Sequence, residues 1–193
     1  MRKWIVLLLL SAPVAAQSGP KAARRVNLMT APVKWPTIRA GDDDAMGGFN
    51  TRVAAIQYLL RFRKFYRGKV DGVFGAKTVA ALKAFQKSRA LKVDGVAGPQ
   101  TLPKLVVPLK RGAKGDAVRA AQILARGASD HVAAMPNLGL SVDGNFGKET
   151  ETAVANAQFS VRGMEGLYLR DNGVMDARSW CLMLGGTVVG EDS

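Results

Sequence analysis

The sequence is poor in the residues from which most catalytic and metal centres are built: its 193 residues include one cysteine and one histidine. The single cysteine, Cys181, excludes an internal disulfide. It lies beside Trp180 in an apolar segment, and we expect it to be a small buried residue. His131 and one distant cysteine cannot assemble a zinc site. No serine or cysteine has a recognisable neighbouring base. The sequence therefore predicts a protein that is not an enzyme and uses no metal or cofactor.

Acidic residues are also scarce, and none forms a convincing centre. The run Asp42-Asp43-Asp44 lacks the glycine-punctuated spacing of a calcium loop and is expected to be a solvated loop. A glycosidase needs two carboxylates that face one cleft, and no pattern places Glu165 opposite Asp171. These absences leave binding as the expected activity.

Lys and Arg outnumber Asp and Glu by 28 to 15, which gives a net charge of +13. The excess is uneven: residues 51–105 hold twelve Lys/Arg against two Asp, whereas residues 109–184 hold nine against eight. A charge of this size indicates a polyanionic partner. The first of these two segments is the expected contact.

The apolar run at the N-terminus is too short to span a bilayer. Arg2 and Lys3 precede it, the run extends from Trp4 to Leu10, and small residues follow at 14–16. This order is typical of a secretory signal peptide over residues 1–16. The protein is therefore expected to be exported to the periplasm, cell wall or extracellular space, with no transmembrane segment after signal removal. Export favours anionic wall polymers or lipid over nucleic acid as the polyanion.

A turn followed by a helix occurs twice in the chain. The pattern Val-Asp-Gly-x-Phe-Gly-x-x-Thr occupies residues 70–78 and returns at 142–150. Asp-Gly is turn chemistry, because Asp bonds its own backbone and Gly accepts a positive φ. Val79, Leu82 and Phe85 then fall on one helical face.

Helical patterns flank the first turn, and weaker ones flank the second. We expect a helix from Asn50 or Thr51, a second to about Lys87, and a short third that begins at Pro99. The second copy has insertions of seven and six residues beside its turns. The predicted divisions are a signal peptide at 1–16, an irregular arm at 17–50, a first module at 51–107, a second module at 108–186 and a tail at 187–193. Within the arm, Val33, Trp35 and Ile38 are candidates to pack on the body.

The pattern of residues 51–105 resembles the peptidoglycan-binding domain of the three-helix type. The carrying motifs are Val-Asp-Gly-x-Phe-Gly-x-x-Thr-x-x-Ala-x-x-x-Phe-Gln and Leu-x-Val-Asp-Gly-x-x-Gly-Pro-x-Thr. Residues 109–184 match more loosely, with Ala157 in the place of Phe85. The resemblance implies an all-α fold of two tandem three-helix modules with long loops. It also implies non-covalent binding of cell-wall peptidoglycan.

Most motif residues have a structural interpretation that competes with ligand binding. Asp71 and Asp143 are expected to hold their turns through backbone bonds. Phe74 and Phe146 are expected to be core residues beneath the turns, and the alternative is stacking on a sugar. Gln57 and Gln86 are expected to be buried amides that satisfy loop backbone.

Residues that are not needed to form the fold are better candidates for ligand contact. A cationic cluster with one aromatic approaches the first turn, and it suits a polymer that carries carboxylates. The alternative is a solvated basic face. Counting the turn itself, the predicted ligand-binding residues are Arg61, Arg63, Tyr66, Arg67, Lys69, Asp71 and Phe74; Lys64 lies in the same cluster.

Three functions remain open from the sequence. The favoured one is an exported, non-catalytic protein that binds peptidoglycan through its basic first module. The second is an interaction or regulatory module that recruits or controls a cell-envelope enzyme. The balanced charge and insertions of the second module favour that role for it. The third is general binding of polyanions through charge alone.

Overall fold

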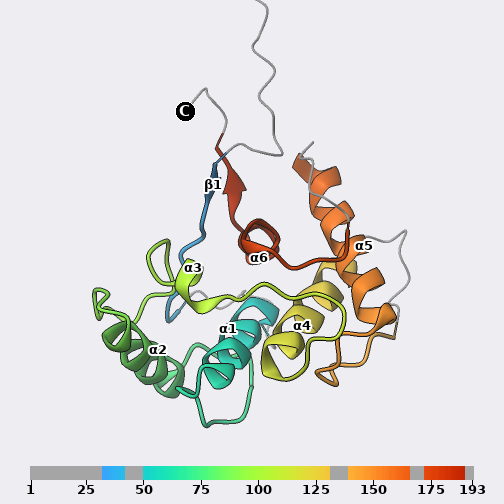
Figure 1. Cartoon of the computed structure of the whole chain (residues 1–193). Coiled ribbons are helices and arrows are strands. Elements are labelled where there is room, and N and C mark those ends of the chain that lie inside the picture. The colour runs from blue at the N-terminus through green and yellow to red at the C-terminus, as the bar shows by residue number, and fades with distance from the viewer. Residues whose placement is uncertain (1–31, 42–49, 131–138, 166–171, 190–193) are drawn as a thin grey trace, which may run out of the picture.

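The computed structural model describes residues 32–41, 50–130, 139–165 and 172–189. These residues form an all-α fold, as the sequence predicts, with one small antiparallel sheet (Figure 1). The helices and strands are β1 (Val33–Lys34), α1 (Thr51–Phe62), α2 (Ala76–Ser88), α3 (Leu102–Leu105), α4 (Asp116–Asp130), α5 (Lys148–Glu165), α6 (Ala177–Met183) and β2 (Thr187–Val188). The predicted signal peptide, Asp42 to Asp44, His131 and Asp171 lie outside the described residues.

Local chemistry explains where the first helices begin. The Asn50 side chain caps α1 by accepting hydrogen bonds from the backbone N–H groups of Arg52 and Val53, at 2.9 and 3.0 Å. This confirms the start predicted at Asn50 or Thr51. Gly75 precedes α2 without a side-chain cap, and the helix ends at Ser88, one residue beyond the predicted end.

The third helix begins later than the sequence predicts. Pro99 lies in a turn, and α3 starts at Leu102. The N–H groups of Thr101 and Leu102 both donate to the carbonyl of Gly98, at 2.9 Å each. This turn delays the helix, so the placement of Pro99 at its first position is wrong.

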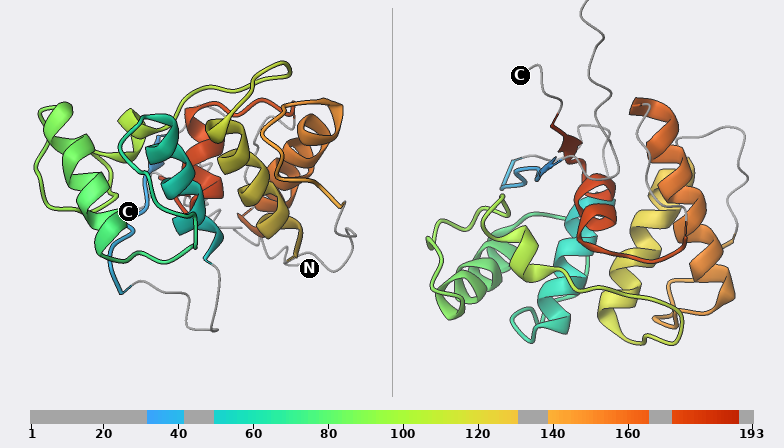
Figure 2. Two further views of the ribbon diagram at one scale, coloured as in Figure 1. Left: turned by 90° about the horizontal axis from the view of Figure 1, so that it is seen from below. Right: turned by 45° about the horizontal axis from the view of Figure 1, so that its top comes forward.

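Helices α1 and α4 lie side by side at the centre of the molecule, and α2 and α5 flank them (Figures 1 and 2). The two central helices run antiparallel, since the start of α1 meets the end of α4. A Cβ at Gly127 would lie 3.0 Å from the Thr51 side chain, so glycine permits the close approach. At the opposite end, Arg61 of α1 bonds Asp116 of α4.

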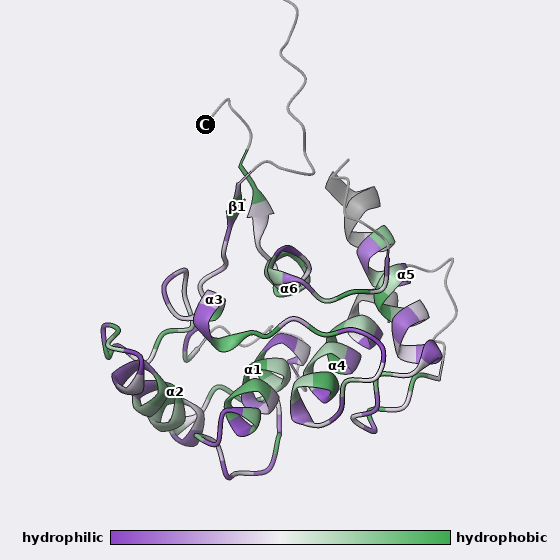
Figure 3. Cartoon of the chain, viewed as in Figure 1, coloured by the Kyte–Doolittle hydropathy of each residue, from purple (hydrophilic) through white to green (hydrophobic). Residues whose placement is uncertain are grey.

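The hydrophobic core is continuous across α1 and α4. Ile56 and Leu59 from α1 and Val118 and Ala121 from α4 are fully buried in one cluster. Figure 3 shows hydrophobic and hydrophilic residues on both central helices and on α2. Burial of this apolar surface supplies most of the free energy that holds the helices together. Among the described helices, none has the length and apolar character needed to cross a bilayer.

The N-terminal arm is ordered where it meets the body. Val33 pairs with Val188 in the β1–β2 sheet. Ile38 exchanges backbone hydrogen bonds with Ala97, at 3.0 and 2.9 Å, and is buried. Trp35 packs against the core, so the expected contacts of the arm with the body are present. Strand β2 occupies residues 187–188, where the sequence predicts only a tail.

Candidate functional site

One buried glutamine ties the first Asp-Gly turn to the preceding helix. Gln57 lies on α1 and is fully buried. Its Nε2 donates to Asp71 Oδ1 at 2.7 Å, to the Val73 carbonyl at 3.0 Å and to Thr78 Oγ1 at 3.0 Å. Its Oε1 accepts from the N–H groups of Asp71 and Gly72, at 3.1 and 3.0 Å. The Gln57 amide therefore both donates hydrogen bonds to the turn and accepts them from its backbone, as predicted.

The same bonding recurs at three later turns. In each, a helical glutamine donates to a hydroxyl and a carbonyl of the next turn and accepts from a glycine N–H. The sets are Gln86 with Gly95, Val96 and Thr101; Gln122 with Gly144, Asn145 and Thr150; and Gln158 with Gly173, Val174 and Ser179. These contacts mark the Gln and Thr/Ser positions of the motif as parts of the scaffold.

The aspartates of the turns are held in place by these bonds. Asp71 Oδ1 accepts from the Val73 N–H at 3.0 Å as well as from Gln57. The hydrogen bond from Gln57 and that backbone bond hold the pKa of Asp71 below its ordinary value. For Asp143, the Asn145 N–H and the Gln122 amide lower the pKa to about 2. Both aspartates thus have the turn-holding role that the sequence favoured.

Both of the predicted contact aromatics are covered by the fold. Phe74 is 3% exposed, in line with its favoured interpretation as a core residue, and Tyr66 is also 3% exposed. The Tyr66 hydroxyl donates to the Lys69 carbonyl at 2.8 Å. Its ring lies on Gly68, where an added Cβ would come within 2.8 Å of it. Neither ring offers an open face on which a sugar could stack.

Two of the predicted contact arginines bond other parts of the protein. Arg61 donates through Nε and Nη2 to the two carboxylate oxygens of Asp116, at 2.9 Å each. Arg63 donates to the carbonyls of Leu105 and Val106, at 3.1 and 3.0 Å, and so satisfies the end of α3. Burial lowers the pKa of Arg63 from its ordinary value. These arginines join helices that lie far apart in the sequence.

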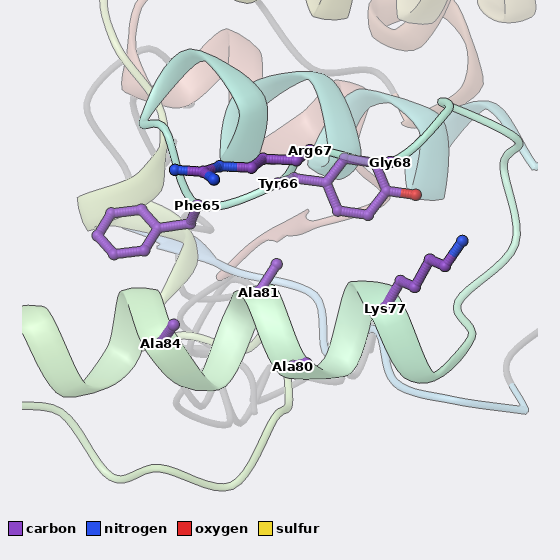
Figure 4. Close-up of a pocket in the computed structure, with 8 residues that line it drawn as sticks. All are labelled: Phe65, Tyr66, Arg67, Gly68, Lys77, Ala80, Ala81 and Ala84. Atoms are coloured by element: carbon purple, nitrogen blue, oxygen red, sulfur yellow. The ribbon is translucent and has the colours of Figure 1, made fainter.

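The remaining cations of the predicted cluster, Lys64, Arg67 and Lys69, are exposed. Arg67 lines a pocket of about 500 Å³ between the loop after α1 and the face of α2 that is turned toward this loop (Figure 4). We call it the Arg67–Lys77 pocket. Its lining residues are Phe65, Tyr66, Arg67, Gly68, Lys77, Ala80, Ala81 and Ala84. The sequence analysis did not identify Lys77 or the alanines, although their spacing of three, four and seven residues marks one helical face.

A smaller pocket of about 320 Å³ lies at the Asp143 turn. Its lining includes Asp143, Lys148 and Glu149, so both signs of charge are present. Within the described residues no group of three or more His, Cys, Asp or Glu side chains is arranged to hold a metal ion.

The comparison with family models identifies the part of the chain that contains the first Asp-Gly turn. Residues 50–105 match a family described as "Putative peptidoglycan binding domain", and they form a peptidoglycan-binding domain 1-like region, as the motifs predict. Among solved structures, the chain is similar to one titled "The crystal structure of SleB N-terminal domain". The identity is 38%, the match covers 38% of this chain and 93% of that chain, and the TM-score is 0.32. No curated protein matches the chain.

Proposed function

We propose that this protein is an exported, non-catalytic protein that binds cell-wall peptidoglycan through its basic N-terminal region, residues 51–107. The observation that carries the proposal is the family match over residues 50–105. The charge of that segment supports it, since twelve Lys/Arg stand against two Asp. Cations of this density attract wall polymers that carry carboxylates.

The second region, residues 108–186, is proposed as a diverged second module. The recurrence of the glutamine-centred bonding at Gln122 and Gln158 supports a duplication. Two features support a different role for it, as a surface that recruits or controls an envelope enzyme. Its charge is nearly balanced, and Phe159 on α5 is about half exposed.

Co-sedimentation with purified sacculi, stripped of accessory polymer, tests the proposal. The exported protein is mixed with sacculi across a series of NaCl concentrations. Retention that persists at high salt is expected, because direct hydrogen bonds and apolar contacts are screened less than exposed charges. Complete loss at modest salt would favour general binding of polyanions. No retention at any salt would contradict wall binding and favour the role in recruiting an envelope enzyme.

A further inference from the structure

We propose that the Arg67–Lys77 pocket binds short peptides that carry a free carboxylate and methyl-sized side chains. This inference rests on the proposed function and specifies which part of the wall polymer is recognised: the peptide and not the glycan. Four properties of the pocket support it: its charge, its hydrogen-bonding groups, its floor and its difference from the second region.

The charged groups of the pocket are all cationic. Arg67 and Lys77 are the charged residues among its lining, and both are exposed. In Figure 4 the guanidinium of Arg67 lies on the Phe65 side, and the ammonium of Lys77 lies on the side of the Tyr66 hydroxyl. A ligand that spans the pocket would meet a positive charge on either side. The Asp71 carboxylate, whose pKa Lys77 helps to lower, lies near the Lys77 side, so an anionic group is favoured most on the Arg67 side.

The charged side chains of the lining are donors, which suits a carboxylate, because Arg and Lys have no acceptor. The Tyr66 hydroxyl donates its proton to the Lys69 carbonyl, so toward a ligand it can only accept. A carboxylate needs donors alone, and the two cations supply them. Sugars use exposed aromatic faces. Tyr66 is buried, and Phe65 is half-buried with its ring edge-on to Phe85 at 5.6 Å between centroids.

The floor of the pocket consists of small side chains. Ala80 and Ala84 are exposed on α2, and Ala81 is buried between them and the core. Methyl groups leave room for backbone to approach closely and pack against side chains of similar size. The floor therefore favours peptides with alanine-sized side chains.

The corresponding helix of the second region lacks this chemistry. Thr78 and Thr150 occupy equivalent positions, since each accepts a hydrogen bond from the buried glutamine of its region. The residue before Thr150 is Glu149, where the first region has Lys77. Thr152 and Asn156 similarly replace Ala80 and Ala84. The pocket is thus specific to the first region.

Nuclear magnetic resonance titration of the full chain with N-acetyl-alanyl-alanine, in its L,L and D,D forms, tests the proposal. We expect saturable shifts of the Ala80 and Ala84 amides. The C-terminal carboxamide of the same dipeptide, which has no negative charge, should bind about tenfold more weakly, equivalent to about 1.4 kcal/mol. Equal binding of acid and amide, or shifts confined to other residues, would overturn the assignment.

Variants localise the effect. Arg67→Ala and Lys77→Ala should each weaken binding of the free acid about fivefold or more. Lys83→Ala is the matched control, because it removes an exposed cation from α2 that does not line the pocket. Ala84→Leu should abolish binding by filling the floor with a residue that favours helix. Circular dichroism and thermal melting check that each variant folds. Equal affinities for Lys77→Ala and Lys83→Ala would refute the role of Lys77.

The outcome is separable from that of the proposed function. Retention on sacculi without dipeptide binding would overturn the pocket and leave wall binding in place. Dipeptide binding at Ala80 and Ala84 without retention on sacculi would overturn wall binding and leave the pocket assignment in place.

Discussion

Replacing Gln57 with leucine should destabilise the protein more than any exposed substitution, because the amide makes five hydrogen bonds from a fully buried position. Leucine has a similar volume and leaves no cavity. It does leave the buried N–H of Gly72 without its partner, which costs about 1–3 kcal/mol. It also removes the charge-assisted bond to Asp71, worth about 1.5–3 kcal/mol.

The expected total is a loss of about 3 kcal/mol in the free energy of unfolding. With a urea m-value of about 2 kcal/mol/M, the midpoint should fall by about 1.5 M. Unfolding in urea, followed by tryptophan fluorescence, measures this shift. The matched control is Gln100→Leu, the same substitution at an exposed glutamine, which should change stability by less than about 0.5 kcal/mol.

A loss for Gln57→Leu within about 1 kcal/mol of the Gln100→Leu value would refute the reasoning. The structure further predicts that Gln158→Leu costs less than Gln57→Leu. At the turn that Gln158 serves, the neutral Asn172 stands where the first turn has Asp71, and its Oδ1 accepts from the Val174 N–H at 3.0 Å. Gln158→Leu therefore removes no charge-assisted hydrogen bond.

Three further predictions concern charged and ionisable groups. A double-mutant cycle of Arg61→Met with Asp116→Asn should give a coupling of about 1 kcal/mol that shrinks at high salt, since both side chains are partly exposed; a coupling of zero at low salt would contradict it. The folded-state pKa of Asp143, about 2, is below its unfolded value of about 3.9, so its contribution to stability is present above pH 4 and is lost as the pH falls toward 2. Urea midpoints from pH 2 to 5 should therefore depend less steeply on pH in Asp143→Asn than in the parent chain, and identical slopes would argue against this. Burial raises the pKa of the Cys181 thiol to about 11, so at pH 8 iodoacetamide should label it at least about a hundredfold more slowly in the folded chain than in guanidinium; equal rates would show that the thiol is accessible.

Local patterns predicted the scaffold well. The start of α1 follows from the capping side chain of Asn50, and the roles of Gln57 and Asp71 follow from turn chemistry. Each of these features depends on residues within about twenty positions of one another. Hydrophobic spacing, capping and turn propensity are local properties, and the sequence displays them directly.

Which of the predicted ligand-contact residues are exposed depends on packing between distant parts of the chain. The local sequence pattern does not indicate that packing. Arg61 bonds Asp116 because α1 and α4 pack antiparallel, 55 residues apart in the chain. Tyr66 is buried because Gly68 leaves room for its ring. Lys77 becomes a candidate only when the loop at Arg67 folds against α2. The sequence therefore indicates a neighbourhood for a site, and the structure changes which side chains are available there.

The β1–β2 pairing was not predictable for a related reason. Each strand has two residues, and Val33 and Val188 are separated by most of the chain. Strands of this length carry no alternation from which to infer a partner. Helix α6 packs against β1, and Cys181 Sγ on α6 donates to the Lys34 carbonyl at 3.5 Å, so the pairing depends on a contact between distant parts of the chain.

The central claim is that the first region is the surface that binds the wall. Its most direct test is the binding isotherm of the full chain on purified sacculi at about 0.15 M NaCl, with two cations removed from either region. The double variant Arg67→Ala/Lys77→Ala alters the first region, and Lys110→Ala/Lys114→Ala removes two exposed cations from the second. We predict that the first variant loses at least about tenfold in affinity, or about 1.4 kcal/mol, while the second binds like the parent chain. Equal losses in the two variants, or a loss confined to the second, would contradict the claim.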